Sequence, residues 1–228
     1  QNLREEEEFL IPEWAPNKIV YQIFPSRFAT TKDVPHDVWY KTPITHKDNL
    51  QGNLRGIINH LDHIKELGVD LIYMTPIFMS DSSHKYDTID YYKIDPSFGT
   101  EEDLKELVQK AHSMGIKVML DAVFNHTSQK FFAFDDVKKN EEKSKYLDWY
   151  YIDGFPLKSK YGEKPNFKTF AYYGGMPKLN LSNPEVAEYF INVGKYWVQN
   201  CNIDGWRLDV GDEVIHAFWK RFRMKINH

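Results

Sequence analysis

The sequence contains very little cysteine and has no long apolar run. Cys201 is the only cysteine among 228 residues, which excludes a disulfide within the chain and favours a reducing compartment, so we predict the cytoplasm. No stretch approaches the roughly 18 consecutive apolar residues of a membrane-spanning helix, so we expect no contact with a membrane. The chain opens with Gln1 rather than Met, and a removed leader would leave no trace, so secretion stays open.

An excess of charge of one sign is also missing. Lys and Arg number 29 against 33 Asp and Glu, the net charge is −4, and no basic stripe is present, so we expect no nucleic-acid partner. No glycine-rich loop follows any apolar run, which disfavours a nucleotide-binding doubly wound fold. Aromatic residues, in contrast, make up 15% of the chain. Such rings fill cores, and they also line carbohydrate clefts.

Short apolar runs alternate with amphipathic stretches along the chain. We predict strands over residues 19–24, 70–74, 117–122 and 205–210, and helices over 54–67, 101–114, from 184 and from about 215. Strands that alternate with helices indicate a parallel α/β sheet. The irregular segment 126–178 breaks this rhythm and is long enough to be a small inserted domain. The predicted division is therefore 1–125, 126–178 and 179–228.

The last predicted strand carries an Arg and an Asp two positions apart. Side chains at i and i+2 of a strand lie on the same face, so Arg207 and Asp209 are expected to project together. A neighbouring cation keeps a carboxylate ionised, as the nucleophile of a covalent glycosidase requires. The alternative is a structural ion pair, since such pairs also perturb pKa values.

Two further polar clusters follow predicted strands. Asp121, Asn125 and His126 lie at the exit of the third strand, and His84 and Tyr86 follow the second. Parallel α/β enzymes place their chemistry at these carboxyl ends. A ring such as Tyr86 can stack on a pyranose, and the alternative is an ordinary loop aromatic. His126 taken alone favours a structural histidine, but beside Asp209 it becomes a candidate ligand for a sugar hydroxyl.

Together these motifs resemble the α-amylase superfamily of glycoside hydrolases. The matching segments are 21–25 (Tyr-Gln-Ile-Phe-Pro), 121–126 and 205–210, which occur in the family's order. Segment 176–180 (Met-Pro-Lys-Leu-Asn) resembles the signature of the neopullulanase, cyclomaltodextrinase and maltogenic amylase branch, and segment 84–88 also fits that branch. The resemblance covers nearly the whole chain. It implies a (β/α)8 TIM barrel, represented here by about four strand–helix units with a small domain inserted after the third strand.

The resemblance also implies an activity and its central residues. The enzyme would be a retaining glycosidase that hydrolyses or transfers α-glucosidic bonds of starch-type oligosaccharides, cyclomaltodextrins or pullulan. Asp209 would be the nucleophile. Arg207 would orient it and keep it charged, and Asp121 would support Arg207 from the neighbouring strand.

The same resemblance implies substrate-binding residues. His84 and His126 would bind hydroxyls of the reacting sugar, and Tyr86 would stack beneath it. Asp212 and Glu213 would border the acceptor side. Many family members carry Ala-Asn where this chain has Gly-Asp at positions 211 and 212, so the acceptor preference stays open.

We expect neither a cofactor nor a metal ion. The branch often carries a calcium loop after the Arg-Phe pair that stands here as Arg27 and Phe28. The segment 29–35 that follows (Ala-Thr-Thr-Lys-Asp-Val-Pro) has too few oxygen ligands for a convincing calcium site.

The number of predicted strands is small for a barrel, which needs eight strand–helix units and ~250 residues. We expect the family's general-acid Glu to lie beyond His228, the last residue of the sequence. A retaining mechanism needs a second carboxyl group about 5–5.5 Å from the nucleophile, and Glu213 is a poor substitute. The isolated chain is therefore expected to be inactive and to self-associate through unpaired strand edges. Two alternatives remain, a non-catalytic carbohydrate-binding protein and a half-barrel that works with another chain.

Overall fold

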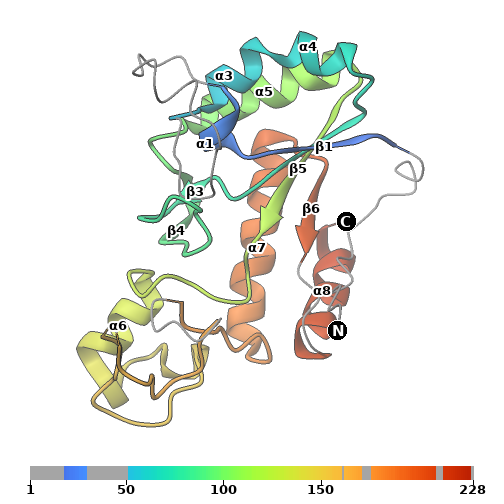
Figure 1. Cartoon of the computed structure of the whole chain (residues 1–228). Helices are drawn as coiled ribbons and strands as arrows, with labels where there is room; N and C mark the ends of the chain where they lie inside the picture. Colours follow the sequence, from blue (N-terminus) through green and yellow to red (C-terminus); the bar gives the residue numbers. More distant parts are fainter. Residues whose placement is uncertain (1–17, 30–50, 161, 171–175, 209–212, 227–228) are drawn as a thin grey trace, which may run out of the picture.

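A parallel sheet covered by helices forms the centre of the molecule (Figure 1). The computed structural model describes residues 18–29, 51–160, 162–170, 176–208 and 213–226. The four sheet strands pair in the order β1 (Val20–Ile23), β2 (Leu71–Met74), β5 (Lys117–Ala122) and β6 (Gly205–Leu208), and every pair is parallel. Strand order therefore follows chain order, as in consecutive units of a TIM barrel, and the four predicted strands are confirmed.

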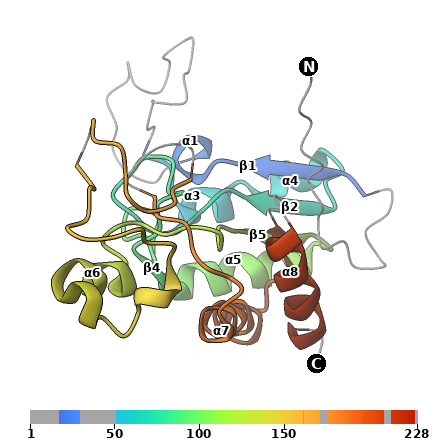
Figure 2. The ribbon, with the colours of Figure 1, turned by 90° about the horizontal axis from the view of Figure 1, so that it is seen from below.

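Amphipathic helices connect these strands. The helices outside segment 126–178 are α1 (Pro25–Phe28), α3 (Leu54–Asn59), α4 (Leu61–Glu66), α5 (Glu101–Ser113), α7 (Pro184–Cys201) and α8 (Glu213–Ile226). In Figure 2, α5 and α7 lie on the same side of the strands, with α7 seen end-on, and α5 packs on both β5 and α7. Among the described residues, no helix has the length and apolar content needed to cross a bilayer.

The predicted starts of α5 and α7 are confirmed. Thr100 accepts the Asp103 N–H, and Asp103 in turn accepts the Thr100 N–H, which forms a capping box at the start of α5. Asn183 accepts the Glu185 N–H ahead of Pro184 at the start of α7. These local contacts set where each helix begins, and thereby where the following strand enters the sheet.

The prediction of one continuous helix over 54–67 is wrong, because the helix is divided at His60 into α3 and α4. The His60 imidazole Nδ1 donates to the Gly56 carbonyl oxygen at 2.8 Å, the acceptor that the His60 backbone N–H would use in an unbroken helix. That N–H donates instead to the Ile57 oxygen at 3.1 Å. The buried stripe nevertheless continues across both pieces, with Leu54, Ile57, Ile58, Leu61 and Ile64 all buried.

Two sets of elements were not predicted. A two-stranded antiparallel hairpin, β3 (Phe78–Met79) with β4 (Asp90–Ile94), lies between β2 and α5. Segment 126–178 contains α6 (Phe132–Asn140) and the short 3-10 helices η1 (Glu141–Lys143) and η2 (Leu147–Trp149). Its apolar side chains belong to the same buried cluster as those of the sheet and helices. The division into three domains stays a prediction.

Aromatic side chains make up much of the core. Trp197 and Trp206 are fully buried, and their indole N–H groups donate to the carbonyl oxygens of Tyr91 (2.8 Å) and Gly194 (3.3 Å). Buried indoles need such partners, because an unpaired buried donor is costly. Among the described residues, aromatic side chains therefore serve largely to fill the core.

Candidate active site

The carboxyl ends of β2, β5 and β6 bring Tyr73, Asp121 and Arg207 together. Asp121 is the register partner of Arg207 across the β5–β6 pair. The Arg207 Nη1 donates to the Tyr73 hydroxyl at 2.7 Å, and that hydroxyl donates to Asp121 Oδ2 at 2.8 Å. The direct separation of Arg207 Nη1 and Asp121 Oδ2 is 3.9 Å. Asp121 therefore reaches Arg207 mainly through the tyrosine hydroxyl.

This triad is largely withdrawn from solvent. The side chains of Arg207 and Asp121 are 19% and 9% exposed, and Tyr73 is buried. Burial, and then the negative charge of Asp121, raises the pKa of Tyr73 far above its usual range. The hydroxyl therefore keeps its proton and stays a donor to Asp121. The Arg207 guanidinium also lies 5.1 Å from the centroid of the Tyr73 ring.

The predicted nucleophile follows this triad in sequence. Asp209 comes two residues after Arg207 and, like Asp212, lies outside the described residues. Glu213 is the first residue of α8 and is exposed. Helix α8 thus begins two residues earlier than predicted. The structure therefore shows which residues hold Arg207 at the end of β6, two positions before Asp209.

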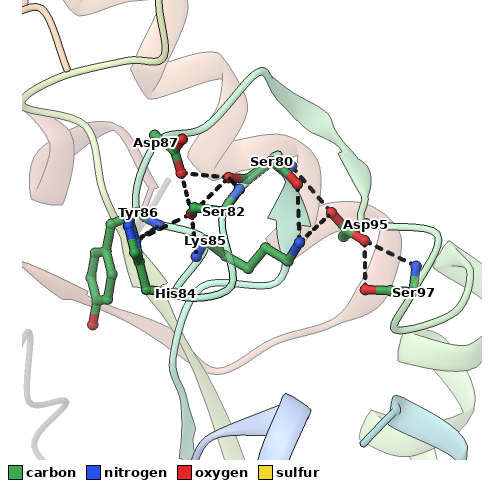
Figure 3. A network of polar contacts seen from close by, with 8 residues as sticks. All are labelled: Ser80, Ser82, His84, Lys85, Tyr86, Asp87, Asp95 and Ser97. Carbon is green, nitrogen blue, oxygen red and sulfur yellow. Dashed lines mark hydrogen bonds and ion pairs between the residues drawn. The ribbon is translucent and has the colours of Figure 1, made fainter. Parts of the chain in front are cut away.

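His84 and Tyr86 lie close together on the loop between β3 and β4 (Figure 3). The His84 Nδ1 accepts the Tyr86 backbone N–H at 3.0 Å, and the two ring centroids are 5.8 Å apart. The Tyr86 hydroxyl lies near Asp121, the same carboxylate that Tyr73 contacts, and its pKa is raised by burial and then by the charge of Asp121. The loop therefore extends the triad toward the surface.

His126 is tied to this loop as well. Its side chain is 2% exposed, and its Nε2 lies 2.8 Å from the Tyr86 carbonyl oxygen. A carbonyl only accepts, so Nε2 carries the proton and Nδ1 is left as an acceptor. Nδ1 is buried and has no hydrogen-bond partner among the described residues. Burial lowers the pKa of His126 to about 4, so the imidazole is neutral at ordinary pH.

A ring from segment 126–178 packs on this histidine. Phe170 stacks on His126 with a centroid distance of 4.5 Å and an interplanar angle of 15°. The signature segment 176–180 also lies against the exit of β5, because the Leu179 N–H donates to the Asn125 oxygen and His126 forms a bridge with Lys178. Two motifs that are separate in the sequence therefore build one wall of the site.

Sequence reasoning missed Tyr73 and Phe170. Tyr73 sits inside an apolar strand, and its hydroxyl at the end of that strand was the only available signal. Phe170 lies in the irregular segment, where no periodicity points to a partner. The structure brings Arg207, Asp121, His84, Tyr86 and His126 into one region, whereas Asp209 and Asp212 lie outside the described residues. Their individual roles stay predictions.

The part of the chain that the structure describes offers no evident metal site. It contains no cluster of three or more His, Cys, Asp or Glu side chains that could hold a metal ion. Arg27 and Phe28 belong to α1, and residues 30–35 of the expected calcium-loop position lie outside the described part of the chain.

Comparisons with known proteins give a consistent result. Residues 22–224 match the family model described as "Alpha amylase, catalytic domain". The chain is 50% identical over 222 residues to the maltogenic alpha-amylase of Bacillus acidopullulyticus, and 50% identical over 224 residues to the cyclomaltodextrinase of Thermoanaerobacter pseudethanolicus. Each match covers 96% of this chain and 38% of the relative, so the chain spans about two fifths of their length.

A solved structure shares the fold at comparable identity. It is the cyclic alpha-maltosyl-(1-->6)-maltose hydrolase from Arthrobacter globiformis, in complex with cyclic alpha-maltosyl-(1-->6)-maltose. The TM-score is 0.85 and the identity is 41%, over 95% of this chain and 49% of that one.

Proposed function

Because this chain belongs to the α-amylase family of catalytic domains, we propose that it takes part in the catalysis of a retaining glycosidase. The enzyme would act on α-glucosidic bonds of starch-type oligosaccharides, cyclomaltodextrins or pullulan. The observation that carries the proposal is the Arg207–Tyr73–Asp121 chain of hydrogen bonds. It holds a guanidinium at the end of β6, two residues before Asp209. A glycosidase that forms a covalent intermediate needs such an ionised, oriented carboxylate.

In this mechanism the carboxylate of Asp209 attacks the anomeric carbon and displaces the leaving sugar, which forms a glycosyl-enzyme ester. Water then hydrolyses the ester, and a sugar hydroxyl in place of water gives transfer. Arg207 favours the charged form of Asp209 by its own charge. Asp121 acts through Tyr73, whose hydroxyl both accepts from Arg207 and donates to Asp121. A second carboxyl group must supply the general acid.

The sugar itself would contact the loop residues. Tyr86 would stack on the apolar face of the reacting ring, and His84 and His126 would bind its hydroxyls. The Nδ1 acceptor of His126 supports this, since a sugar hydroxyl would satisfy a buried polar atom that has no partner within the part of the chain that the structure describes. Asp212 and Glu213 would border the acceptor sugar.

The substrate class follows from the relatives. The structure from Arthrobacter globiformis holds a cyclic maltosyl-maltose, and the curated relatives are named as a maltogenic amylase and a cyclomaltodextrinase. We extend this class of α-linked glucan to the present chain. The chemistry proceeds through carboxylates, so the proposal includes no cofactor, and the single, buried Cys201 supports a location in the cytoplasm.

The test is a reducing-sugar assay on cyclomaltodextrin, pullulan and soluble starch with the full-length protein. Asp209→Asn keeps the shape of the side chain but removes the attacking charge. We expect it to lower turnover by several orders of magnitude, with little change in the affinity for oligosaccharide.

The matched control is Asp62→Asn, the same substitution at an exposed position of α4. It should leave turnover unchanged. Near-normal turnover of Asp209→Asn ends the assignment of the nucleophile. Oligosaccharide binding without any hydrolysis by the unaltered protein supports instead the alternative of a non-catalytic carbohydrate-binding protein.

A further inference from the structure

A buried ion pair lies behind the loop that carries His84 and Tyr86. The Lys85 Nζ is 3.0 Å from Asp95 Oδ2 and donates to the Ser80 carbonyl oxygen at 3.0 Å. The two charged side chains are only 13% and 8% exposed. A buried charge pair is costly to desolvate, and it is weak evidence for stability. Such a pair can instead hold the chain in one specific conformation.

The backbone at Lys85 makes the neighbouring side chains diverge. Its φ is 65°, in the left-handed region that a residue with a side chain seldom adopts. In Figure 3, His84 and Tyr86 extend to one side of the loop and Lys85 extends to the other, toward Asp95. The Lys85 N–H donates to Ser82 Oγ at 3.0 Å. The conformation that separates Lys85 from the two rings is thus held at its backbone and at its ammonium group.

Asp95 is itself firmly anchored, so it can serve as a fixed point. It follows β4 directly and accepts from the Ser97 N–H at 2.9 Å, the Ser97 hydroxyl at 2.6 Å and the Ser80 N–H at 3.2 Å. Burial alone would raise the pKa of Asp95, but the hydrogen bonds from Ser97, Lys85 and Ser80 outweigh it and lower that pKa. The carboxylate therefore remains charged opposite Lys85.

We propose that Lys85 is a positioning residue, whose buried ammonium, paired with Asp95, holds its own backbone in the conformation that presents the Tyr86 ring to the sugar. The inference rests on the proposed function. Lys85 touches no substrate in this arrangement and acts only through Tyr86. Its loss should therefore matter only as long as the Tyr86 ring is there to be positioned.

A double-mutant cycle in the full-length protein measures this dependence. We expect Tyr86→Ala to lower kcat/KM on maltooligosaccharides roughly tenfold, through the lost stacking contact. Lys85→Met, which keeps most of the length of the side chain but not its charge, should lower kcat/KM by about the same factor. The double variant should be no worse than Tyr86→Ala alone, because residues that act as a unit are not additive.

Three further variants separate positioning from general destabilisation. Lys105→Met is the matched control, since the Lys105–Glu102 pair has the same 3.0 Å separation but is 40% and 81% exposed, and it should leave kcat/KM unchanged. Lys85→Arg retains the charge and should restore kcat/KM to within about threefold of the unaltered protein. If Lys85→Met leaves Asp95 as an unpaired buried charge and fails to fold, Lys85→Met with Asp95→Asn removes both charges and should show the same tenfold loss.

Different results would overturn the proposed function and the inference about Lys85. Absence of α-glucan hydrolysis by the unaltered protein overturns the proposed function and the inference with it. Normal hydrolysis that is insensitive to loss of the Lys85 charge overturns the inference alone. Additive losses in the cycle, roughly hundredfold in the double variant, also overturn it, because Lys85 then acts independently of the Tyr86 ring.

Discussion

His126 shows how one residue combines burial, stacking and a ring nitrogen that makes no hydrogen bond to the described part of the chain. Its Nε2 is committed to the Tyr86 carbonyl oxygen, and one face of its ring is covered by Phe170. Protonation would place a charge on Nδ1, which is buried without a partner among the described residues. This is why burial lowers the pKa of the imidazole to about 4. The histidine is therefore a neutral acceptor, suited to a sugar hydroxyl.

The same burial makes the stability depend on pH. The His126 pKa is about 4 in the folded state against 6.5 for an unperturbed histidine, so acid favours the unfolded state. Its contribution is fully present above pH 6.5 and is lost as the pH falls from 6.5 toward 4. We expect a loss of up to about 3 kcal/mol in the free energy of unfolding over that window.

Urea unfolding of the unaltered protein and of His126→Gln at pH 7.5 and pH 5 checks this. Gln keeps an N–H for the Tyr86 oxygen but does not titrate. The stability advantage of the unaltered protein over the variant should shrink between the two pH values, since the carboxylates are common to both proteins. A constant difference would show that His126 takes up its proton equally in both states.

At the scale of elements, α7 connects the parts of the fold. It is the longest described helix and carries Trp197, which packs against Phe78 of β3, and Gly194, which faces α8. The close approach at Gly194 is tight. A Cβ added there would lie 2.3 Å from Cζ of Phe222 and 2.7 Å from Cδ1 of Ile226. The small residue therefore sets how closely α7 and α8 can pack.

Gly194→Ala should accordingly destabilise the protein although alanine is the better helix former. Overpacking costs roughly 1–3 kcal/mol, and the gain in helix propensity offsets about 1 kcal/mol of that. Phe222 is fully buried, and its ring packs against Phe124 and Trp219. We expect a net loss of about 1 kcal/mol in the free energy of unfolding, measured by urea denaturation. Asn192→Ala, at an exposed position of the same helix, is the control, and a more stable Gly194→Ala protein would contradict this packing.

At the scale of the whole molecule, the outer sides of β1 and β6 are the edges of the sheet. Among the described residues, β1 pairs only with β2, and β6 pairs only with β5. The β1 edge is also apolar, because Ile19, Val20 and Phe24 are 55%, 48% and 44% exposed. Unpaired strand edges with apolar side chains recruit other strands. This argument concerns the 228-residue chain when it is expressed alone.

We expect that isolated chain to self-associate, which static light scattering of the purified protein measures. Val20→Lys places a charge on the β1 edge and should lower the association. Met224→Lys is the matched control, since Met224 is 64% exposed but lies on α8, and it should leave the association unchanged. A monodisperse monomer at high concentration would mean that these edges are covered in solution.

The sequence by itself determined the elements whose signals are local. Periodicity and short apolar runs located the four parallel strands and the starts of α5 and α7, because these features depend on residues only a few positions apart. The polar groups at the strand exits were found for the same reason, since parallel strands place their carboxyl ends on one edge. The family resemblance added the identity of the fold, which the match over residues 22–224 confirms.

Only the tertiary structure decided how the site is held. The Tyr73 hydroxyl joins residues 48 and 134 positions away, and the stacking of Phe170 on His126 depends on the path of an irregular segment. The break at His60 could not be predicted from the sequence, since it arises where a side chain competes with the backbone for an acceptor. The Lys85–Asp95 pair could not be predicted either, since Lys85 meets a partner that is distant along the chain. Periodicity describes which face a residue occupies. Which atoms meet across that face is set by packing between segments that are distant in the chain.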